Sequence, residues 1–233
     1  SVQTMFQINC GDYTYNYQLS NDGTVDYFPL AVGNGYYTFT VFVQNTGTEF
    51  FYFLEGAADV QMADEKAPFL LPNKIVNYTP ESEAVQFSYE LAAHASTNLE
   101  VIQQVYYWIE QNISYDNSKV SYVQVNTDYL PDVDEVLRSK KGICYDYAAL
   151  AAAMLRANGI PCQLIMGDAN TPEGTVVHAW NMVWTEEQGW ITVEIEAKPG
   201  TWERIDLTFA SSQNAGIEEF IGDGSNYMDM YVH

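Results

Sequence analysis

One stretch limits the possible folds of this chain more than any other: KKGICYDYAALAAAMLRANGIPC, residues 140–162. Its larger apolar side chains recur at helical spacing, and small alanines fill the positions between them. This pattern predicts a buried helix that packs closely on several sides. We expect the helix to begin near Ile143 or Cys144 and to end near Asn158 and Gly159. A cysteine therefore lies at the start of the helix.

The rest of the chain predicts an α+β fold. Residues 1–91 alternate aromatic and β-branched residues with turn signals, and 20–24 has the sequence of a hairpin turn. Because helices and strands do not alternate along the chain, a doubly wound α/β fold is disfavoured. We expect an N-terminal β-rich region at 1–93 and a second domain at 94–233. Strands are expected at 36–45, 50–56, 85–91, 162–168, 175–184, 190–196 and 202–209, and helices at 97–113 and 131–142, the second ending at Gly142.

Composition excludes some functions. The chain has 233 residues, only 9 Lys and Arg, and a net charge of −22, so it repels nucleic acids and anionic membranes. It contains no apolar run of about 18 residues that would span a membrane. Its acidity, its few lysines and a first residue other than Met favour a secreted or cell-surface protein. The oligomeric state stays open.

The chain has three cysteines and no Cys-x-x-Cys pair, which argues against a structural zinc site. No acidic segment has the ligand spacing of an EF-hand. We therefore expect no metal and no organic cofactor. A disulfide between Cys10 and Cys162 would leave Cys144 as a free thiol.

The position of Cys144 has two interpretations. At a helix N-terminus the backbone N–H groups and the helix dipole stabilise a thiolate and can also hold an oxyanion. Gly142 would then let the backbone approach a substrate. Alternatively, Cys144 is a small apolar residue of a buried helix.

A nucleophilic cysteine needs a base, and the chain has three histidines. His178 lies in an apolar strand and is the best candidate, since His94 lies in a polar linker and His233 is expected to fray. A carboxylate would then orient the imidazole. Asp206 lies in the apolar segment WERIDLTF, and Glu194 and Glu196 are its rivals.

The 140–162 helix, the strand HAWNMVW and the segment WERIDLTF together resemble the bacterial branch of the transglutaminase-like superfamily. The shared pattern is a Gly-x-Cys helix start, an alanine-rich helix ending in GIP, a His-Ala-Trp strand and an Asp strand. Intervals of 34 and 28 residues separate Cys144, His178 and Asp206. The resemblance extends over about residues 99–209. Two departures are Leu207 in place of the usual Pro or Thr, and an apparent extra strand and turn at 190–201.

The resemblance implies a papain-like fold, in which the nucleophile helix packs on an antiparallel sheet. It implies Cys144 as nucleophile, His178 as general base and acid, and Asp206 as the orienting residue. Tyr129 is a candidate oxyanion donor, and Tyr145 and Trp180 are candidates for the substrate groove. The expected substrate is a protein or peptide.

The expected reaction is acyl transfer through a thioester, with hydrolysis favoured over crosslinking. A true protein-glutamine γ-glutamyltransferase stays an alternative. A non-catalytic cell-surface or scaffold module that kept the fold is another.

Overall fold

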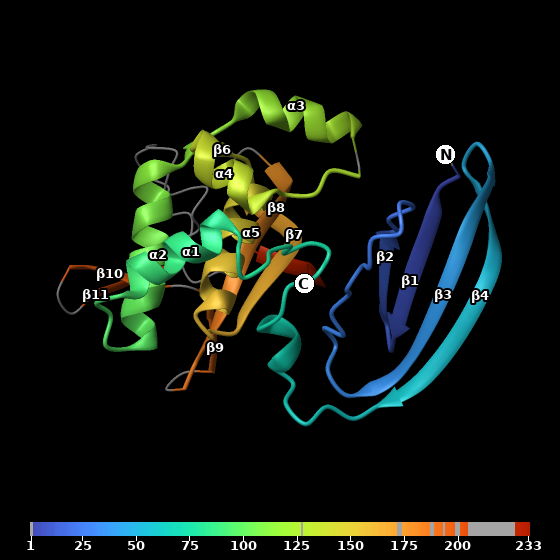
Figure 1. The fold of residues 1–233 in the computed structure, drawn as a ribbon, viewed down its shortest axis with the longest axis horizontal. Helices are drawn as coiled ribbons and strands as arrows, with labels where there is room; N and C mark the ends of the chain where they lie inside the picture. Colours follow the sequence, from blue (N-terminus) through green and yellow to red (C-terminus); the bar gives the residue numbers. More distant parts are fainter. Residues whose placement is uncertain are drawn as a thin grey trace. The chain divides into compact units, whose positions relative to one another are not determined.

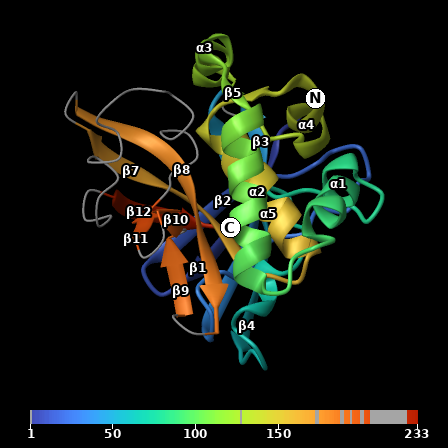
Figure 2. The same ribbon diagram turned by 90° about the vertical axis from the view of Figure 1, so that its left-hand side faces the viewer.

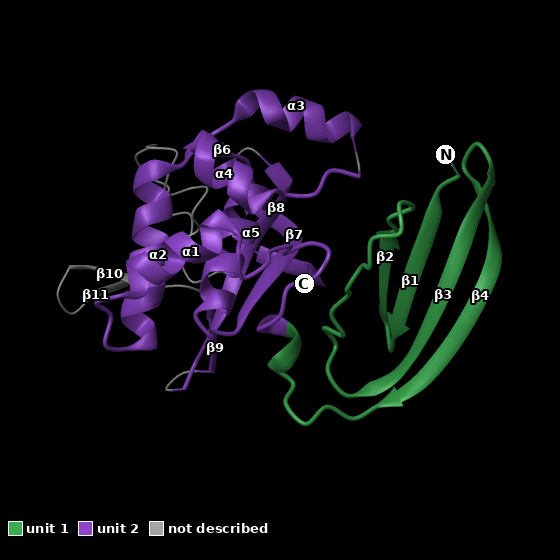
Figure 3. Cartoon of the chain, viewed as in Figure 1, with its two compact units in different colours: residues 1–68 green, residues 69–233 purple. Residues whose placement is uncertain are grey.

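The computed structural model describes residues 2–126, 128–171, 174–186, 189–192, 194–198, 201–204 and 227–233. The chain divides into two compact units, unit 1 at residues 1–68 and unit 2 at residues 69–233 (Figure 3). This division falls N-terminal to the boundary expected after residue 93.

Unit 1 is a four-stranded antiparallel sheet with the strand order β2-β1-β3-β4 (Figure 1). Its strands are β1 (Thr4–Cys10), β2 (Tyr13–Gln18), β3 (Gly35–Thr46) and β4 (Glu49–Val60). The strands expected at 36–45 and 50–56 are thereby confirmed as β3 and β4. Positive φ angles at Gly11 and Gly47 allow the two tight hairpin connections.

Residues 20–24 form a turn, as expected, but the prediction that this turn closes a β-hairpin is wrong. Thr24 N–H donates to the Asp22 side chain at 2.9 Å, and Gly23 has a φ of 89°, so the backbone does turn there. The turn, however, lies within the long connection between β2 and β3 and joins no pair of strands.

Unit 2 contains the helices. They are a short 3-10 helix, η1 (Ala67–Phe69), which begins in unit 1, followed by α1 (Glu83–Ala92), α2 (Asn98–Asn112), α3 (Asn117–Val125), α4 (Val133–Ser139) and α5 (Cys144–Ala157). α3 was not expected from the sequence. Its N-cap, Asp116, accepts hydrogen bonds from the backbone of Ser118 and Lys119.

The strand expected at 85–91 is wrong, because these residues form most of α1. The segment VQFSYEL alternates like a strand, but Ala84, Val85 and Ser88 are the buried positions, which is the spacing of one helix face. Pro80 and Ser82 come just before the helix, where they favour its start.

The other predicted helices are confirmed, with one changed end. Thr97 caps α2 by accepting from the Glu100 N–H at 3.2 Å. α4 does not end at Gly142 as expected: its C-cap is Lys140, in the left-handed conformation with a φ of 56°. Gly142 belongs to the short strand β6 (Lys141–Gly142), which pairs in parallel with β5 (Ser114–Tyr115).

α5 lies at the centre of unit 2, as the alanine pattern predicted. Every residue from Tyr145 to Arg156 is buried. The helix ends in a Schellman motif, because Ile160 N–H donates to Leu155 O and Gly159 N–H donates to Arg156 O. Gly159 has the positive φ, 74°, that this motif needs.

A second antiparallel sheet has the strand order β12-β7-β8-β9. Its strands are β7 (Cys162–Thr171), β8 (Gly174–Thr185), β9 (Gly189–Thr192) and β12 (Tyr227–Val232). α5 packs against β7 and β8, while α1, α2 and α4 also contact α5 (Figures 1 and 2). The expected arrangement of a helix on an antiparallel sheet, preceded by an all-β region, is thereby confirmed.

A two-stranded ribbon of β10 (Glu194–Lys198) and β11 (Thr201–Arg204) follows β9. The extra strand expected within 190–201 is confirmed by β10, whereas residues 199 and 200 lie outside the described residues, so the turn stays a prediction. The remainder of the strand expected at 202–209 lies outside the described residues.

A buried arginine of α5 donates hydrogen bonds to backbone carbonyls near both ends of unit 2. Arg156 donates to the backbone carbonyls of Leu71, Cys162 and His233 at 2.9, 2.9 and 2.7 Å. His233 is buried rather than frayed, and it exchanges two backbone hydrogen bonds of 2.8 Å with Leu164. The expectation for His233 was wrong because β12 joins the sheet beside β7.

Among the described residues, no helix has the length and apolar character needed to cross a membrane.

Candidate active site

Cys144 is the first residue of α5, and its N-cap is Ile143 in extended conformation. Cys144 is partly exposed, whereas Cys10 and Cys162 are both buried. All three are free thiols, so the Cys10–Cys162 disulfide that the sequence left open is not formed. The sulfur atoms lie in the cores of different units, Cys10 on β1 and Cys162 at the start of β7.

His178 lies on β8 and is buried, with 4% of its surface exposed. Its ring stacks near Trp180, with ring centroids 6.1 Å apart, and lies 6.3 Å from the ring of Tyr227 on β12. Trp180 and Tyr227 meet edge to face at 4.9 Å. The structure therefore brings His178 and Trp180 together, and Tyr227 completes an aromatic wall that the sequence did not predict.

A glycine makes room for this wall. Gly167 on β7 pairs with His178, and a Cβ atom there would lie 2.8 Å from the ring of Trp180. It would also collide with the backbone carbonyl of Met228 on β12. Only glycine lets the indole and the neighbouring strand lie this close.

A buried amide joins β8 to the first turns of α5. The Asn181 side chain donates to the carbonyl of Ala148 at 3.0 Å and to that of Gln163 at 3.2 Å. Ala148 lies one turn beyond Cys144, and Asn181 lies three residues beyond His178. This contact fixes the beginning of the helix against the strand that carries the histidine.

The carboxylate expected to orient the imidazole cannot be placed from the described residues. Asp206 lies outside the described residues. Its rivals Glu194 and Glu196 lie on β10, for which only the backbone is described. The role of Asp206 stays a prediction.

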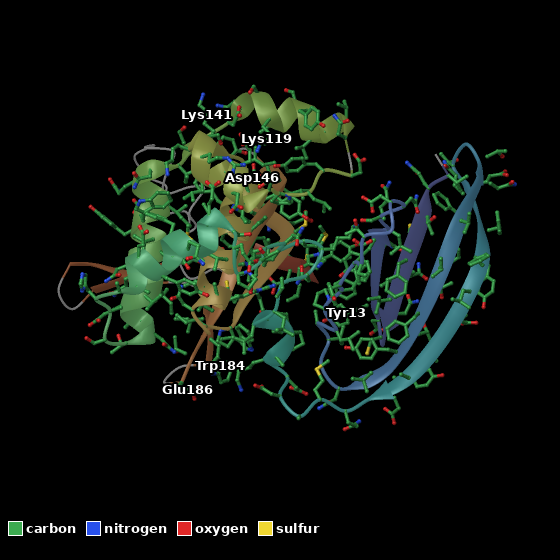
Figure 4. The ribbon with its side chains drawn as sticks, in the orientation of Figure 1. Tyr13, Lys119, Lys141, Asp146, Trp184 and Glu186 are labelled. Carbon is green, nitrogen blue, oxygen red and sulfur yellow. The ribbon has the colours of Figure 1, made fainter. Side chains whose placement is uncertain are left out.

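Next to Cys144, a carboxylate is completely buried. Asp146, the third residue of α5, has 0% exposure. Its Oδ2 atom accepts from Ile143 N–H at 2.9 Å and from Lys119 Nζ at 2.8 Å (Figure 4). Its Oδ1 atom accepts a short hydrogen bond from the Tyr129 hydroxyl. Lys119 Nζ also lies 3.0 Å from that hydroxyl.

This network bears on the role expected for Tyr129. A phenol has one proton, and in this structure that proton goes to Asp146. Burial first, and then the hydrogen bond to Asp146, raise the pKa of Tyr129 far above its usual value. The hydroxyl therefore stays protonated, but its hydrogen bond competes with donation to an oxyanion.

Tyr145 lies beside this network. Its ring meets that of Tyr129 edge to face at 6.3 Å, and it is buried. Burial, followed by the charge of Asp146, raises the pKa of Tyr145 well above its usual range. Tyr129 and Tyr145, predicted separately, are thus brought together at the start of α5.

Gly142 has a different role from the one expected. A Cβ atom at this position would lie 2.7 Å from the Cβ of Asp146 and 3.1 Å from its Oδ2. The missing side chain makes room for the carboxylate, whereas the expected role was to let a substrate approach the backbone.

Sequence reasoning missed Asp146 and Lys119. The available signal was an acid three residues after the N-cap, inside an apolar helix, where an unpaired charge would be costly. Nothing in the sequence connects it to Lys119, which lies 27 residues away. Within the described part of the chain, no cluster of three or more His, Cys, Asp or Glu side chains suits a metal ion.

Comparison with known proteins identifies a family. Residues 85–195 match the family model described as Transglutaminase-like superfamily. An uncharacterised protein of Mycobacterium tuberculosis is 32% identical over 120 residues, which cover 47% of this chain and 35% of that protein. Kyphoscoliosis peptidase of Homo sapiens is 27% identical over 130 residues, covering 52% of this chain and 17% of the peptidase.

A protein-glutamine gamma-glutamyltransferase of Pseudomonas aeruginosa is 30% identical over 105 residues, covering 41% of this chain and 14% of the transferase. The chain therefore spans about a third or less of the length of these curated relatives. A solved structure from Cytophaga hutchinsonii has a TM-score of 0.49 and 14% identity, and covers 100% of this chain and 78% of that one.

The matched segment runs from α1 into β10 and includes Cys144 and His178. Residues 85–195 of this chain form a domain of the transglutaminase-like superfamily.

Proposed function

We propose that this chain is a thiol-dependent enzyme that transfers acyl groups from peptide or carboxamide bonds. The observation that carries the proposal is the position of Cys144. It is the first residue of a 14-residue helix, partly exposed, within a transglutaminase-like domain. The helix packs on β8, the strand that carries His178. A helix N-terminus favours the thiolate form of a cysteine.

In the proposed mechanism, the Cys144 thiolate attacks the carbonyl carbon of the scissile amide. Backbone N–H groups at the start of α5 stabilise the oxyanion that forms. The imidazolium of His178 protonates the leaving amine as the carbon–nitrogen bond breaks, which leaves a thioester on Cys144. Asp206 orients the imidazole.

A second nucleophile completes the reaction. His178 takes a proton from water, the hydroxide oxygen attacks the thioester, and a carboxylic acid leaves as the Cys144 sulfur is released. If an amine attacks instead, the product is a new amide bond. We propose hydrolysis as the main outcome and a protein or peptide as the substrate.

The alternative is transfer to an amine, and it has its own support. The matched protein from Pseudomonas aeruginosa is named for γ-glutamyl transfer, whereas the human one is named a peptidase. Both reactions pass through the same thioester, so the choice depends on which nucleophile reaches it.

The first test measures the reactivity of Cys144. Iodoacetamide is applied from pH 4 to 9 to the wild type, to His178→Ala and to the control His94→Ala, and the labelled cysteine is identified by mass spectrometry. His94 is exposed and lies on the loop before α2. We expect rapid labelling of Cys144 at pH 6 that is lost in His178→Ala and kept in His94→Ala. Labelling only near pH 8.5 in the wild type would contradict the enzyme proposal and favour a non-catalytic module.

The second test separates the two reactions. A glutamine-containing protein such as casein is incubated with the enzyme, with and without a fluorescent primary amine. New amino termini indicate peptide hydrolysis, ammonia release alone indicates deamidation, and incorporated fluorescence indicates transfer. Cys144→Ala is the control, and it should abolish each signal.

A further inference from the structure

The carboxylate of Asp146 is a charge that the proposed triad does not use. It is fully buried, and three groups bond to it: the Ile143 N–H, the Tyr129 hydroxyl and Lys119 Nζ. These groups come from three parts of the chain, namely the N-cap of α5, the segment before α4, and α3. A buried carboxylate with this many hydrogen-bond donors is held in one position.

Asp146 helps to shape the start of α5. Its bond to Ile143 N–H satisfies a backbone donor just before the helix, where intrahelical acceptors are missing. Its side chain also lies against Gly142, where no Cβ would fit. This one carboxylate therefore holds Gly142 and Ile143, the two residues just before Cys144.

An uncompensated charge on the same carboxylate would oppose the role proposed for Cys144. It places a negative charge two residues from Cys144, and a nearby like charge disfavours a thiolate. A positively charged side chain beside the carboxylate would offset this effect. Lys119 supplies it at 2.8 Å, with only 22% of its side chain exposed, so solvent screens the pair less than it would a surface pair.

We propose that Lys119 is a positioning residue that neutralises Asp146, so that the carboxylate can hold the start of α5 without opposing the Cys144 thiolate. This inference rests on the proposed function, since it concerns the reactivity of Cys144. Tyr129 bonds to both members of this pair. Its hydroxyl donates a hydrogen bond to Asp146, and its oxygen lies 3.0 Å from Lys119 Nζ.

Several charged groups on the elements that contact α5 have hydrogen-bond or ion-pair partners other than Asp146. Asp134 of α4 accepts from Ala84 N–H at 2.9 Å, and Arg138 of α4 pairs with Glu83 of α1 at 3.0 Å. Glu100 of α2 accepts from Ser96 N–H. His178 of β8 is the proposed base, and Lys141 of β6 is exposed. Lys119 is thus the cation that this structure pairs with Asp146.

The test is the pH dependence of Cys144 alkylation in four variants of the full chain. Lys119→Met leaves Asp146 uncompensated, so we expect the midpoint to rise by roughly one pH unit. Asp146→Asn keeps an oxygen for the Ile143 N–H but removes the charge, so we expect the midpoint to fall. The double variant Lys119→Met/Asp146→Asn should return close to the wild type. Lys119→Arg keeps the charge and should also stay close to it.

Lys141→Met is the matched control, because it removes one lysine charge from the neighbouring strand β6. Near-ultraviolet circular dichroism establishes that each variant is folded. If Lys119→Met fails to fold, the fall expected in Asp146→Asn remains a separate measurement. Equal midpoints in Asp146→Asn and the wild type, or equal shifts in Lys119→Met and Lys141→Met, would overturn the inference.

The two proposals fail in different ways. If wild-type Cys144 titrates as an ordinary thiol and His178→Ala has no effect, the proposed enzyme function fails. If wild-type Cys144 is activated but the Lys119 and Asp146 variants leave its midpoint unchanged, only the role of Lys119 fails.

Discussion

The Asp146 side chain lies against the backbone of Gly142, so closely that a Cβ atom at residue 142 would be 2.7 Å from the Asp146 Cβ. Asp146 is buried and bonded on both oxygens, so it has little room to move. The two residues lie on either side of Cys144. The position of the proposed nucleophile therefore depends on a glycine and an acid that do no chemistry themselves.

We predict that Gly142→Ala destabilises unit 2 by about 1–3 kcal/mol, the usual cost of overpacking. It should also slow alkylation of Cys144, because the start of α5 must shift. Urea unfolding and the labelling rate are the measurements. Gly56→Ala is the control, since a Cβ at Gly56 on β4 would meet nothing within 4 Å. Equal stability of the two variants would refute the packing role of Gly142.

Arg156 should be among the most sensitive positions in the chain. Arg156→Met removes three hydrogen bonds to buried carbonyls, so we expect a loss of about 3–5 kcal/mol in the free energy of unfolding. Arg138→Met is the control, since its pair with Glu83 is exposed, and it should change stability by at most about 1 kcal/mol. Urea denaturation measures both. A loss from Arg156→Met no larger than that of the control would contradict this account.

The histidine at residue 233 should make stability depend on pH. Burial, together with the positive charge of Arg156, lowers the pKa of His233 to about 3. An unfolded histidine binds a proton below about pH 6.5, whereas the folded one stays neutral to about pH 3. The contribution of neutral His233 to the free energy of unfolding is therefore complete above about pH 6.5. It is lost as pH falls towards 3, by up to about 1.4 kcal/mol per pH unit.

Replacing His233 by Gln should remove this slope. We expect the free energy of unfolding of His233→Gln to fall less between pH 7 and pH 5 than that of the wild type. His94→Gln controls for the loss of an exposed imidazole. A wild-type slope retained in His233→Gln would show that His233 is not buried as a neutral group.

The three thiols should differ sharply in reactivity. Cys10 and Cys162 are buried, and burial raises the pKa of the Cys162 thiol to about 12. We expect a thiol reagent at pH 7.5 to modify only Cys144 in the folded protein and all three cysteines in urea. A Cys144→Ser variant should give no rapid modification. Rapid modification of Cys162 in the folded protein would contradict the packing of β7 against α5.

The sequence predicted elements whose signals are local. The limits of α5 follow from spaced apolar residues, a glycine and a proline, all within one stretch, and the structure confirms them. The segment 85–91 failed because seven residues alternate like a strand while also forming one helix face. Only packing against α5 and α2 decides between these possibilities.

The candidate residues, like the helices and strands, could be predicted only where the signal is local in the sequence. Cys144 and His178 became candidates because each is unusual at its own position. Lys119 and Tyr227 were missed because neither is unusual locally, and each acquires its meaning from a partner far along the chain. In the structure the Tyr129 hydroxyl donates to Asp146, a carboxylate that was not among the predicted site residues.

The three carbonyls that bind Arg156 have a consequence for synthesis on the ribosome. Leu71 O and Cys162 O are available early, but His233 O emerges 77 residues after the guanidinium. Until then, Arg156 lacks one of its three acceptors and β7 lacks the neighbour that β12 becomes. The helix that carries Cys144 is therefore expected to reach its final packing only after residue 233 has left the exit tunnel.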